Sequence, residues 1–180
     1  RGVRLTNAYS ASPLCSPTRA SIMVGQNPAR TGITAPGCHL AKVTLKKQLV
    51  QGSDRVNLAN SVTRLNPEYH TLAEALRAAG YATGHFGKWH LGHNLAPGDA
   101  YEPKDQGFEV DWPHAPRAPG PGGGYLAPWK FIADPAIVDE AGRHVDERMA
   151  DEAGSFIRAS KGRPFFVNFW LFSVHSPWNA

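Results

Sequence analysis

The run FFVNFWLFSV, from Phe165 to Val174, constrains the fold most, because it is almost continuously apolar and rich in β-favouring residues. Such a short apolar segment is typical of a strand buried on both faces in a parallel sheet. It follows residues 145–160, where apolar side chains recur at helical spacing and predict an amphipathic helix. A helix that leads directly into a buried strand favours an α/β fold.

A second helix–strand unit begins at Thr71, which forms a capping box with Glu74. We expect a helix that Gly80 ends, followed by a strand over residues 81–86. The expected apolar face of this helix consists of Leu72, Ala75, Leu76 and Ala79. The two units together predict an α/β architecture with a mostly parallel sheet sandwiched by helices.

The remaining segments give weaker signals. Alternating residues 3–9 predict a short strand, and Pro17 to Gly25 reads as a short helix. Residues 34–65 show no clear period and are expected to form a long loop with at most one helical turn. Residues 96–135 are rich in proline and glycine, so we expect an irregular loop there. Residues 1–180 are expected to form part of a single domain.

Composition excludes several classes of protein. The formal net charge of +4 is spread along the chain without a recognition motif, so nucleic-acid binding is a weak hypothesis. No segment approaches 18 uninterrupted apolar residues, so no membrane span is expected. Two cysteines, Cys15 and Cys38, form no disulfide framework, although a single bridge stays open. The ends carry neither an initiator methionine nor a signal peptide, and a fragment of a longer chain is expected.

The first candidate for chemistry is Cys15, which stands just before the predicted helix with Arg19 one turn further on. Unpaired backbone N–H groups at a helix start stabilise an anion, and they would lower the pKa of a thiol. The alternative is that Cys15 is a small buried hydrophobe and Arg19 a surface residue. Cys38 has no such surroundings and is expected to be a bystander.

Two further candidates follow predicted strands. Lys88 and His90 lie in GKWHLGH, and His175 follows the apolar run. Ligands of α/β sheets bind beyond the carboxyl ends of strands, where a lysine can hold an anion and a histidine can move a proton. Zinc at His90 and His93 is disfavoured, because no partner ligand follows at suitable spacing. The other histidines are expected to be structural or solvent-facing, namely His39, His70, His85, His114 and His144.

These motifs together resemble those of the type I, formylglycine-dependent sulfatases of the alkaline phosphatase superfamily. Residues Cys15 to Ala20 (CSPTRA) match the signature C-x-P-x-R. Residues 80–93 (GYATGHFGKWHLGH) match the second signature, and residues 163–178 resemble the family's strand and histidine. The order of the three motifs is also that of the family. The resemblance implies that residues 1–180 form part of a single sulfatase catalytic domain.

The resemblance implies a role for each matched residue. A formylglycine-generating enzyme would oxidise Cys15 to formylglycine, whose hydrate attacks the sulfur of a sulfate ester. Arg19 would stabilise the hydrate, Lys88 would hold sulfate oxygens, and His90 would be the base for sulfate release. His175 would contact the sulfate and protonate the leaving alcohol. The substrate implied is a sulfated small molecule or glycan, and the implied location is the periplasm or the outside of the cell.

The chain also departs from the family pattern. Calcium (Ca²⁺) is expected in the complete enzyme, but the main ligands are not matched, because Asp54, Asp99, Asp105 and Asp111 fall outside the family's motifs. Only Cys15, as formylglycine, would contact the ion. We therefore expect these 180 residues to be inactive alone.

Two alternatives to sulfate ester hydrolysis stay open. One is a phosphoesterase on the same scaffold, although such enzymes usually use serine or threonine where this chain has Cys15. The other is a degenerate, non-catalytic domain that retains an anion site. The irregular loop contains three aromatic residues, Trp112, Tyr125 and Trp129. They either stack on a sugar of the substrate or pack within the loop.

Overall fold

The computed structural model describes residues 2–42, 44–45, 60–114, 124–132, 134–173 and 175. These ranges contain helices on both sides of a small sheet, which confirms the predicted α/β class. The elements are α1 (Cys15–Val24), α2 (Pro28–Thr31), β1 (Thr44–Leu45), β2 (Ser61–Val62), α3 (Leu72–Ala78), β3 (Ala82–Gly87), η1 (Pro103–Gln106), β4 (Val110–Trp112), α4 (Val145–Ala159) and β5 (Phe165–Trp170).

The main sheet has three strands in the order β4-β3-β5, and β3 is parallel to both of its neighbours. His85 in the middle of β3 lies opposite Asp111 of β4 and Asn168 of β5. Because the strands are parallel, their carboxyl ends share one edge of the sheet. The separate pair β1 and β2 is antiparallel.

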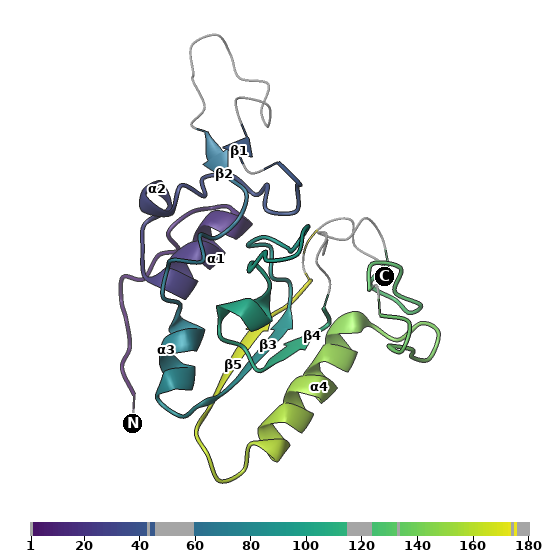
Figure 1. Ribbon diagram of the computed structural model, residues 1–180. Coiled ribbons are helices and arrows are strands. Elements are labelled where there is room, and N and C mark those ends of the chain that lie inside the picture. The colour runs from purple at the N-terminus through teal and green to yellow at the C-terminus, as the bar shows by residue number, and fades with distance from the viewer. Residues whose placement is uncertain are drawn as a thin grey trace.

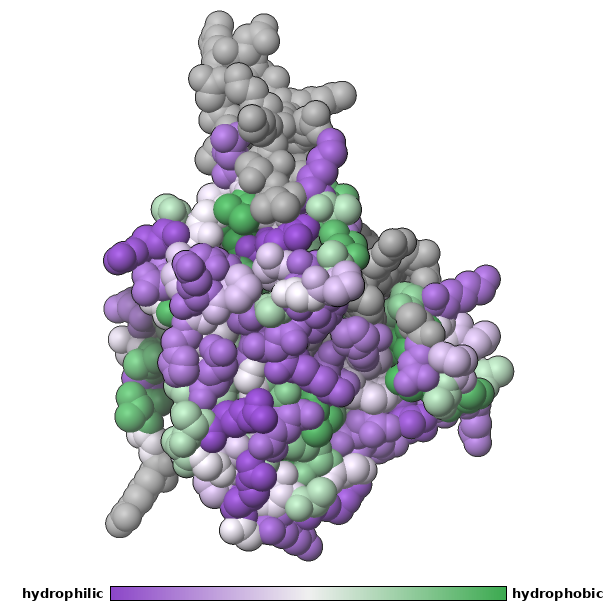
Figure 2. Space-filling model, viewed as in Figure 1, coloured by the Kyte–Doolittle hydropathy of each residue, from purple (hydrophilic) through white to green (hydrophobic). Residues whose placement is uncertain are grey.

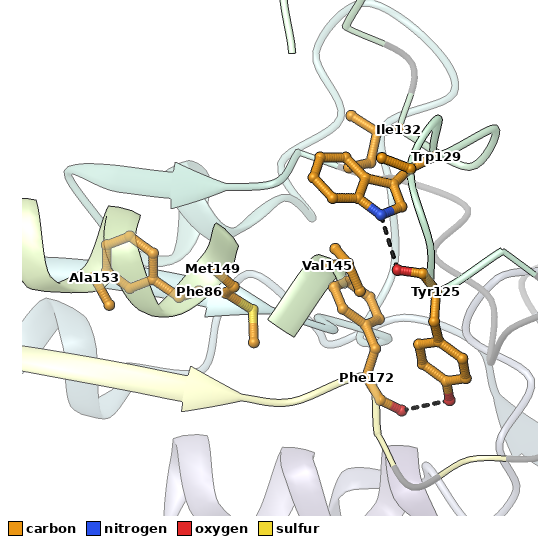
Figure 3. Close-up of a cluster of buried hydrophobic side chains, with 9 residues drawn as sticks. Phe86, Tyr125, Trp129, Ile132, Val145, Met149, Ala153 and Phe172 are labelled. Atoms are coloured by element: carbon orange, nitrogen blue, oxygen red, sulfur yellow. Dashed lines mark hydrogen bonds between the residues drawn. The ribbon is translucent and has the colours of Figure 1, made fainter. Parts of the chain in front are cut away.

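The helices form a layer on each face of this sheet (Figure 1). On one face α4 packs against β3, and the ring of Phe86 lies 5.7 Å from that of Phe156. The first hydrophobic cluster fills this space and reaches the segment that follows β5 (Figure 3). The second cluster lies on the other face, beneath α1 and α3, and includes Ala20, Met23, Ala73 and Phe108.

Each predicted helix is present, and its ends follow from its sequence. Gly25 ends α1 in the left-handed conformation at φ 65°, which favours glycine. The predicted capping box of α3 is complete, because Thr71 accepts from the Glu74 backbone N–H and the Glu74 carboxylate accepts from that of Thr71. The side chain of His144 caps α4 by accepting from the Asp146 N–H.

Two local predictions are wrong. Residues 3–9 form no strand, and the side chain of Val3 is 90% exposed, because no described strand lies beside this segment to pair with it. The predicted apolar face of α3 is also wrong, since Leu72 is exposed and Ala73 is the buried residue. Tertiary packing decides the buried face: Ala73 belongs to the second hydrophobic cluster, and the chain at Gly107 lies against α3 so closely that a Cβ there would lie 2.5 Å from the Glu74 nitrogen.

The irregular stretches contain more structure than predicted. Within residues 96–135 the structure has η1 and β4, and β4 is a sheet strand whose three residues are too few to show a period. Within residues 34–65 the described part has β1 and β2 and no helix. β5 is the predicted strand, but it is buried less fully than expected, because it lies at the edge of the described sheet and leaves Phe165 44% exposed.

The surface seen in Figure 2 is mostly hydrophilic, and its hydrophobic residues lie in small separate groups. Among the described residues, no helix is long and apolar enough to cross a membrane.

Candidate active site

The five predicted site residues lie around one edge of the sheet. Lys88 and His90 follow the carboxyl end of β3, and His175 follows β5 after a short segment. Cys15 is the first residue of α1, and Arg19 lies one turn further along that helix. Because parallel strands end together, residues from three distant parts of the chain meet at this edge.

Cys15 lies at a helix start whose backbone N–H groups lack a side-chain cap. The capping position is Leu14, and the first turn of α1 contains no acidic residue. The half-buried thiol lies 3.3 Å from Nδ1 of His90, within hydrogen-bond distance for sulfur. The helix start therefore offers its positive end to an anion next to a histidine.

His90 is held in an unusual conformation. Its φ of 57° is the only positive value at a non-glycine residue within the described ranges. The Ser16 hydroxyl donates a hydrogen bond of 2.8 Å to the carbonyl of His90 and stabilises this backbone. Burial, and then the positive charge of Lys88, lower the pKa of His90 to about 3. His90 is therefore a neutral imidazole near pH 7, as a base must be.

Arg19 is a half-buried cation beside the thiol. Its Nη1 donates to the carbonyl of Lys88 at 2.5 Å, and its guanidinium lies 4.6 Å from the ring centre of Trp170. Its Nε is buried without a hydrogen-bond partner. Burial lowers the pKa of Arg19 to about 10, which shows that the surroundings oppose its charge.

Lys88 is a second cation and is buried, with 4% of its surface exposed, and burial lowers its pKa. Its backbone N–H donates to the Trp170 carbonyl at 2.9 Å. Gly87 permits this approach, since its φ is 109° and any Cβ would collide with that carbonyl. Within the described residues, no carboxylate forms an ion pair with Arg19 or Lys88. Two such charges favour an anionic ligand.

The segment that carries His175 is fastened to the first hydrophobic cluster. The Tyr125 hydroxyl lies 2.5 Å from the His175 carbonyl and 3.1 Å from that of Phe172, and its one proton serves both (Figure 3 draws the second contact). The Asp146 carboxylate accepts from the backbone N–H groups of Phe172 and Ser173. His175 lies near enough for its charge to lower the pKa of His90.

The aromatic residues of the irregular loop pack within the protein. Tyr125 and Trp129 are 3% and 7% exposed, and Trp129 donates to the Tyr125 carbonyl at 2.9 Å (Figure 3). Trp112 is half-buried beneath the Arg148 guanidinium. The structure therefore favours packing over sugar stacking for all three.

An open groove of about 320 Å³ lies next to Cys15 and Arg19. Its other lining residues include Ser12, Leu14 and Trp170. A small anionic group could enter along it and reach both the thiol and the guanidinium.

His39 also belongs to this edge, although its sequence context gave no signal. Its Nδ1 lies 3.0 Å from Nε2 of His90. The contact spans 51 positions of sequence, so no local pattern could predict it. The preceding Cys38 is free and buried, and burial raises the pKa of its thiol to about 12, which fits the expected bystander.

The other histidines lie away from this edge or serve the core. His85 is fully buried between the Gly87 carbonyl and the Asn168 amide, with its pKa lowered to about 4 by burial. The side chain of His70 is 70% exposed. His114 contacts Asp111, and His144 caps α4, so both have the structural role expected.

The described residues do not fit a calcium site. No group of three or more histidine, cysteine, aspartate and glutamate side chains among them could hold a metal ion. The carboxylates of Asp99 and Asp105 accept hydrogen bonds within their own loop, and Asp111 contacts His114. Asp54 lies outside the described residues.

Comparison with known proteins places this edge in context. A family model described as Sulfatase matches residues 1–180. The chain is 28% identical over 191 residues to N-acetylgalactosamine-6-sulfatase of Rattus norvegicus, a match that covers 98% of this chain and 33% of the relative. It is 28% identical over 199 residues to an arylsulfatase of Hemicentrotus pulcherrimus, a match that covers 97% of this chain and 31% of the relative. The chain thus spans about a third of the length of these curated relatives.

A solved structure shares the fold. It is the crystal structure of Ps i-CgsB in complex with k-i-k-neocarrahexaose, with a TM-score of 0.62 and 20% sequence identity. The match covers 97% of this chain and 38% of that chain.

Proposed function

This chain belongs to the sulfatase family of the alkaline phosphatase superfamily, and from this premise we propose that it hydrolyses a sulfate ester. We propose that the nucleophile is the hydrate of a formylglycine made from Cys15 by a formylglycine-generating enzyme. One observation carries the proposal: the half-buried Arg19 and the buried Lys88 are cations without a carboxylate partner among the described residues, next to Cys15 at a helix start. Two cations and the free N–H groups of a helix start suit the binding of a sulfate group.

In the proposed reaction, one hydroxyl of the hydrate loses its proton to water and its oxygen attacks sulfur, while the sulfur–oxygen bond to the alcohol breaks. His175 donates the proton that the leaving alcohol needs, while Lys88 and Arg19 hold the sulfate oxygens. The product of this step is a sulfate ester of the hydrate. His90 then takes the proton of the second hydroxyl, the carbon–oxygen bond to sulfate breaks, and the aldehyde returns and is hydrated by water.

This chemistry explains why the chain encodes a cysteine that it does not use as a thiol. A hydrate has a second hydroxyl, so sulfate can leave by elimination from carbon. A serine or cysteine ester would instead need water to attack sulfur. The proposal therefore favours sulfate over phosphate as the group transferred, although a phosphoesterase and a non-catalytic anion-binding domain stay as alternatives.

Because the 180 residues alone are expected to be inactive, the test uses the complete protein that contains them, produced together with a formylglycine-generating enzyme, and compares 4-nitrophenyl sulfate with 4-nitrophenyl phosphate as substrates. We expect hydrolysis of the sulfate, loss of at least about 100-fold in Lys88→Ala, and no turnover in Cys15→Ala. His70→Ala is the matched control, because the His70 side chain is exposed and contacts Glu74 of α3. Preferential hydrolysis of the phosphate would establish the phosphoesterase. Binding of sulfate without any hydrolysis would establish the anion-binding domain.

We further propose that the natural substrate is a sulfated glycan or small molecule. The support is the name of one relative, N-acetylgalactosamine-6-sulfatase, and the complex of Ps i-CgsB with k-i-k-neocarrahexaose. The proposed location, the periplasm or the outside of the cell, rests on the family resemblance alone.

A further inference from the structure

His39 and His90 form a hydrogen-bonded pair at the edge of the candidate active site. Nδ1 of His39 lies 3.0 Å from Nε2 of His90, and the ring centres are 5.3 Å apart with planes inclined by 27°. Rings at these separations meet edge to edge along the line between the nitrogens. This geometry is that of an N–H···N hydrogen bond, in which one ring donates and the other accepts.

The opposite nitrogen of His90 faces the reacting group. Nδ1 of His90 lies 3.3 Å from Sγ of Cys15, which stands in for a hydroxyl oxygen of the formylglycine hydrate. A neutral imidazole has one protonated and one unprotonated nitrogen. If His90 is to take a proton at Nδ1, its own proton must therefore be on Nε2, and His39 must accept it.

We propose that His39 is a positioning residue that accepts a hydrogen bond from Nε2–H of His90 and so keeps Nδ1 of His90 free to act as the base. This inference rests on the proposed function, because it assigns His39 to the step in which sulfate leaves. The arrangement follows the general rule that the hydrogen bond made by one ring nitrogen of a histidine sets the state of the other.

The proton balance of the step follows from these contacts. His90 takes the proton of the free hydroxyl at Nδ1, the C=O double bond forms, and the carbon–oxygen bond to sulfate breaks. The imidazolium that results keeps its Nε2–H pointed at Nδ1 of His39, whose lone pair stabilises the added charge. The proton on Nδ1 of His90 is then lost to water, which restores the base.

Contacts of the residues on either side of His39 fix the position of its ring. Cys38 is 1% exposed within the second hydrophobic cluster, and its thiol lies near enough to Ser16 for that residue to lower its pKa. Leu40 N–H donates to the Gly37 carbonyl and closes a turn around His39. The same Ser16 holds the carbonyl of His90, so one side chain links the two histidine-bearing segments. The exposed ring of His39 has no other partner among the described residues, so core packing does not explain its place.

The experiment compares two variants of the complete enzyme that contains this chain, after maturation, in steady-state and rapid-mixing kinetics. His39→Phe keeps a flat ring but removes the acceptor, whereas His39→Asn places an amide oxygen near the position of Nδ1. We expect His39→Phe to lower kcat about 10- to 100-fold with little change in KM. We expect His39→Asn to recover most of that loss. His70→Phe is the matched control for adding phenylalanine at an exposed histidine.

If His39 acts in the step that releases sulfate, the kinetics of His39→Phe should show a signature that a general disruption of the fold would not produce. In His39→Phe, the alcohol should appear in a rapid burst of about one equivalent per active site, because sulfate release becomes limiting. Intact-protein mass spectrometry should then detect the sulfated enzyme. A rise in KM at unchanged kcat would make His39 a substrate contact and overturn the proposal, and so would equal activity of His39→Phe and the wild type.

A direct observation on the wild type is independent of any variant. Side-chain ¹⁵N NMR of the histidine-labelled enzyme should show His90 as the Nε2–H tautomer. Protonation at Nδ1 instead would overturn the proposal even if the wild type is active. If the complete wild-type enzyme were inactive with formylglycine at position 15, the proposed function would be defeated, so the two failures are distinguishable.

Discussion

Replacement of Arg19 by methionine should remove the anion site while leaving the fold as stable as before. The pKa of Arg19 falls from 12.5 to about 10 through burial. Since one pKa unit is equivalent to 1.36 kcal/mol, holding the charge there costs about 3 kcal/mol. The hydrogen bond to the Lys88 carbonyl and the contact with Trp170 offset about 2–3 kcal/mol of this cost. The two contributions nearly cancel.

Methionine would keep the apolar stem of the side chain against Trp170 and remove the charge. We therefore expect the free energy of unfolding of Arg19→Met to lie within about 1 kcal/mol of the wild type. In contrast, inorganic sulfate at 100 times its Kd should stabilise the wild type by about 2.7 kcal/mol, and should stabilise the variant only by its general effect on proteins.

The assay is urea unfolding in sodium sulfate and in sodium chloride of matched ionic strength. Arg30→Met serves as the control, because Arg30 is an exposed arginine of α2 outside the site. The reasoning is refuted if Arg19→Met loses more than about 2 kcal/mol in chloride, because Arg19 would then be a structural residue. It is equally refuted if sulfate stabilises wild type and variant alike.

Three further outcomes follow from the structure. The buried His85, with its pKa lowered to about 4, binds a proton less readily than in the unfolded chain. The free energy of unfolding should therefore be highest above pH 6.5 and fall by about 3 kcal/mol towards pH 4. Urea unfolding midpoints that do not change with pH would contradict this. Gly87→Ala should lower the free energy of unfolding by at least about 2 kcal/mol more than Gly98→Ala, because both glycines have positive φ but of the two only Gly87 meets the β5 backbone. Equal melting temperatures of the two variants would exclude the collision. Tyr125→Phe should lower the unfolding free energy by about 1 kcal/mol and kcat/KM about tenfold, because it frees the segment of His175; unchanged kinetics would show that the hydroxyl does not position it.

Local signals in the sequence predicted the helices and strands that depend on local physics. The capping box at Thr71 and the glycine at position 25 mark helix ends through hydrogen bonds and backbone conformations within a few residues. The apolar run of β5 and the amphipathic pattern of α4 likewise act within one element. These features were sufficient for the fold class.

Features that depend on distant partners could not be predicted in this way. Residues 3–9 alternate as a strand does, but a strand also needs a neighbour to pair with. The three residues of β4 are a strand only because β3 lies beside them. The contact of His39 with His90 joins two loops, and only the folded chain brings them together.

For the candidate site, too, the sequence predicted features that lie within one segment and missed those that depend on the fold. The positions of Cys15, Arg19 and Lys88 followed from signatures that each lie within one segment. Their lack of carboxylate partners among the described residues is a tertiary property, as is the burial that lowers the pKa of Arg19. Sequence therefore indicated which side chains to examine, and the fold supplied their electrostatics.

The most direct test of the proposed function is the mass of the peptide that contains Cys15, measured in a preparation that hydrolyses a sulfate ester. The proposal predicts formylglycine at position 15, in a fraction that rises with specific activity across preparations made with more or less of the maturing enzyme. An active preparation in which position 15 is entirely an unmodified thiol would contradict it.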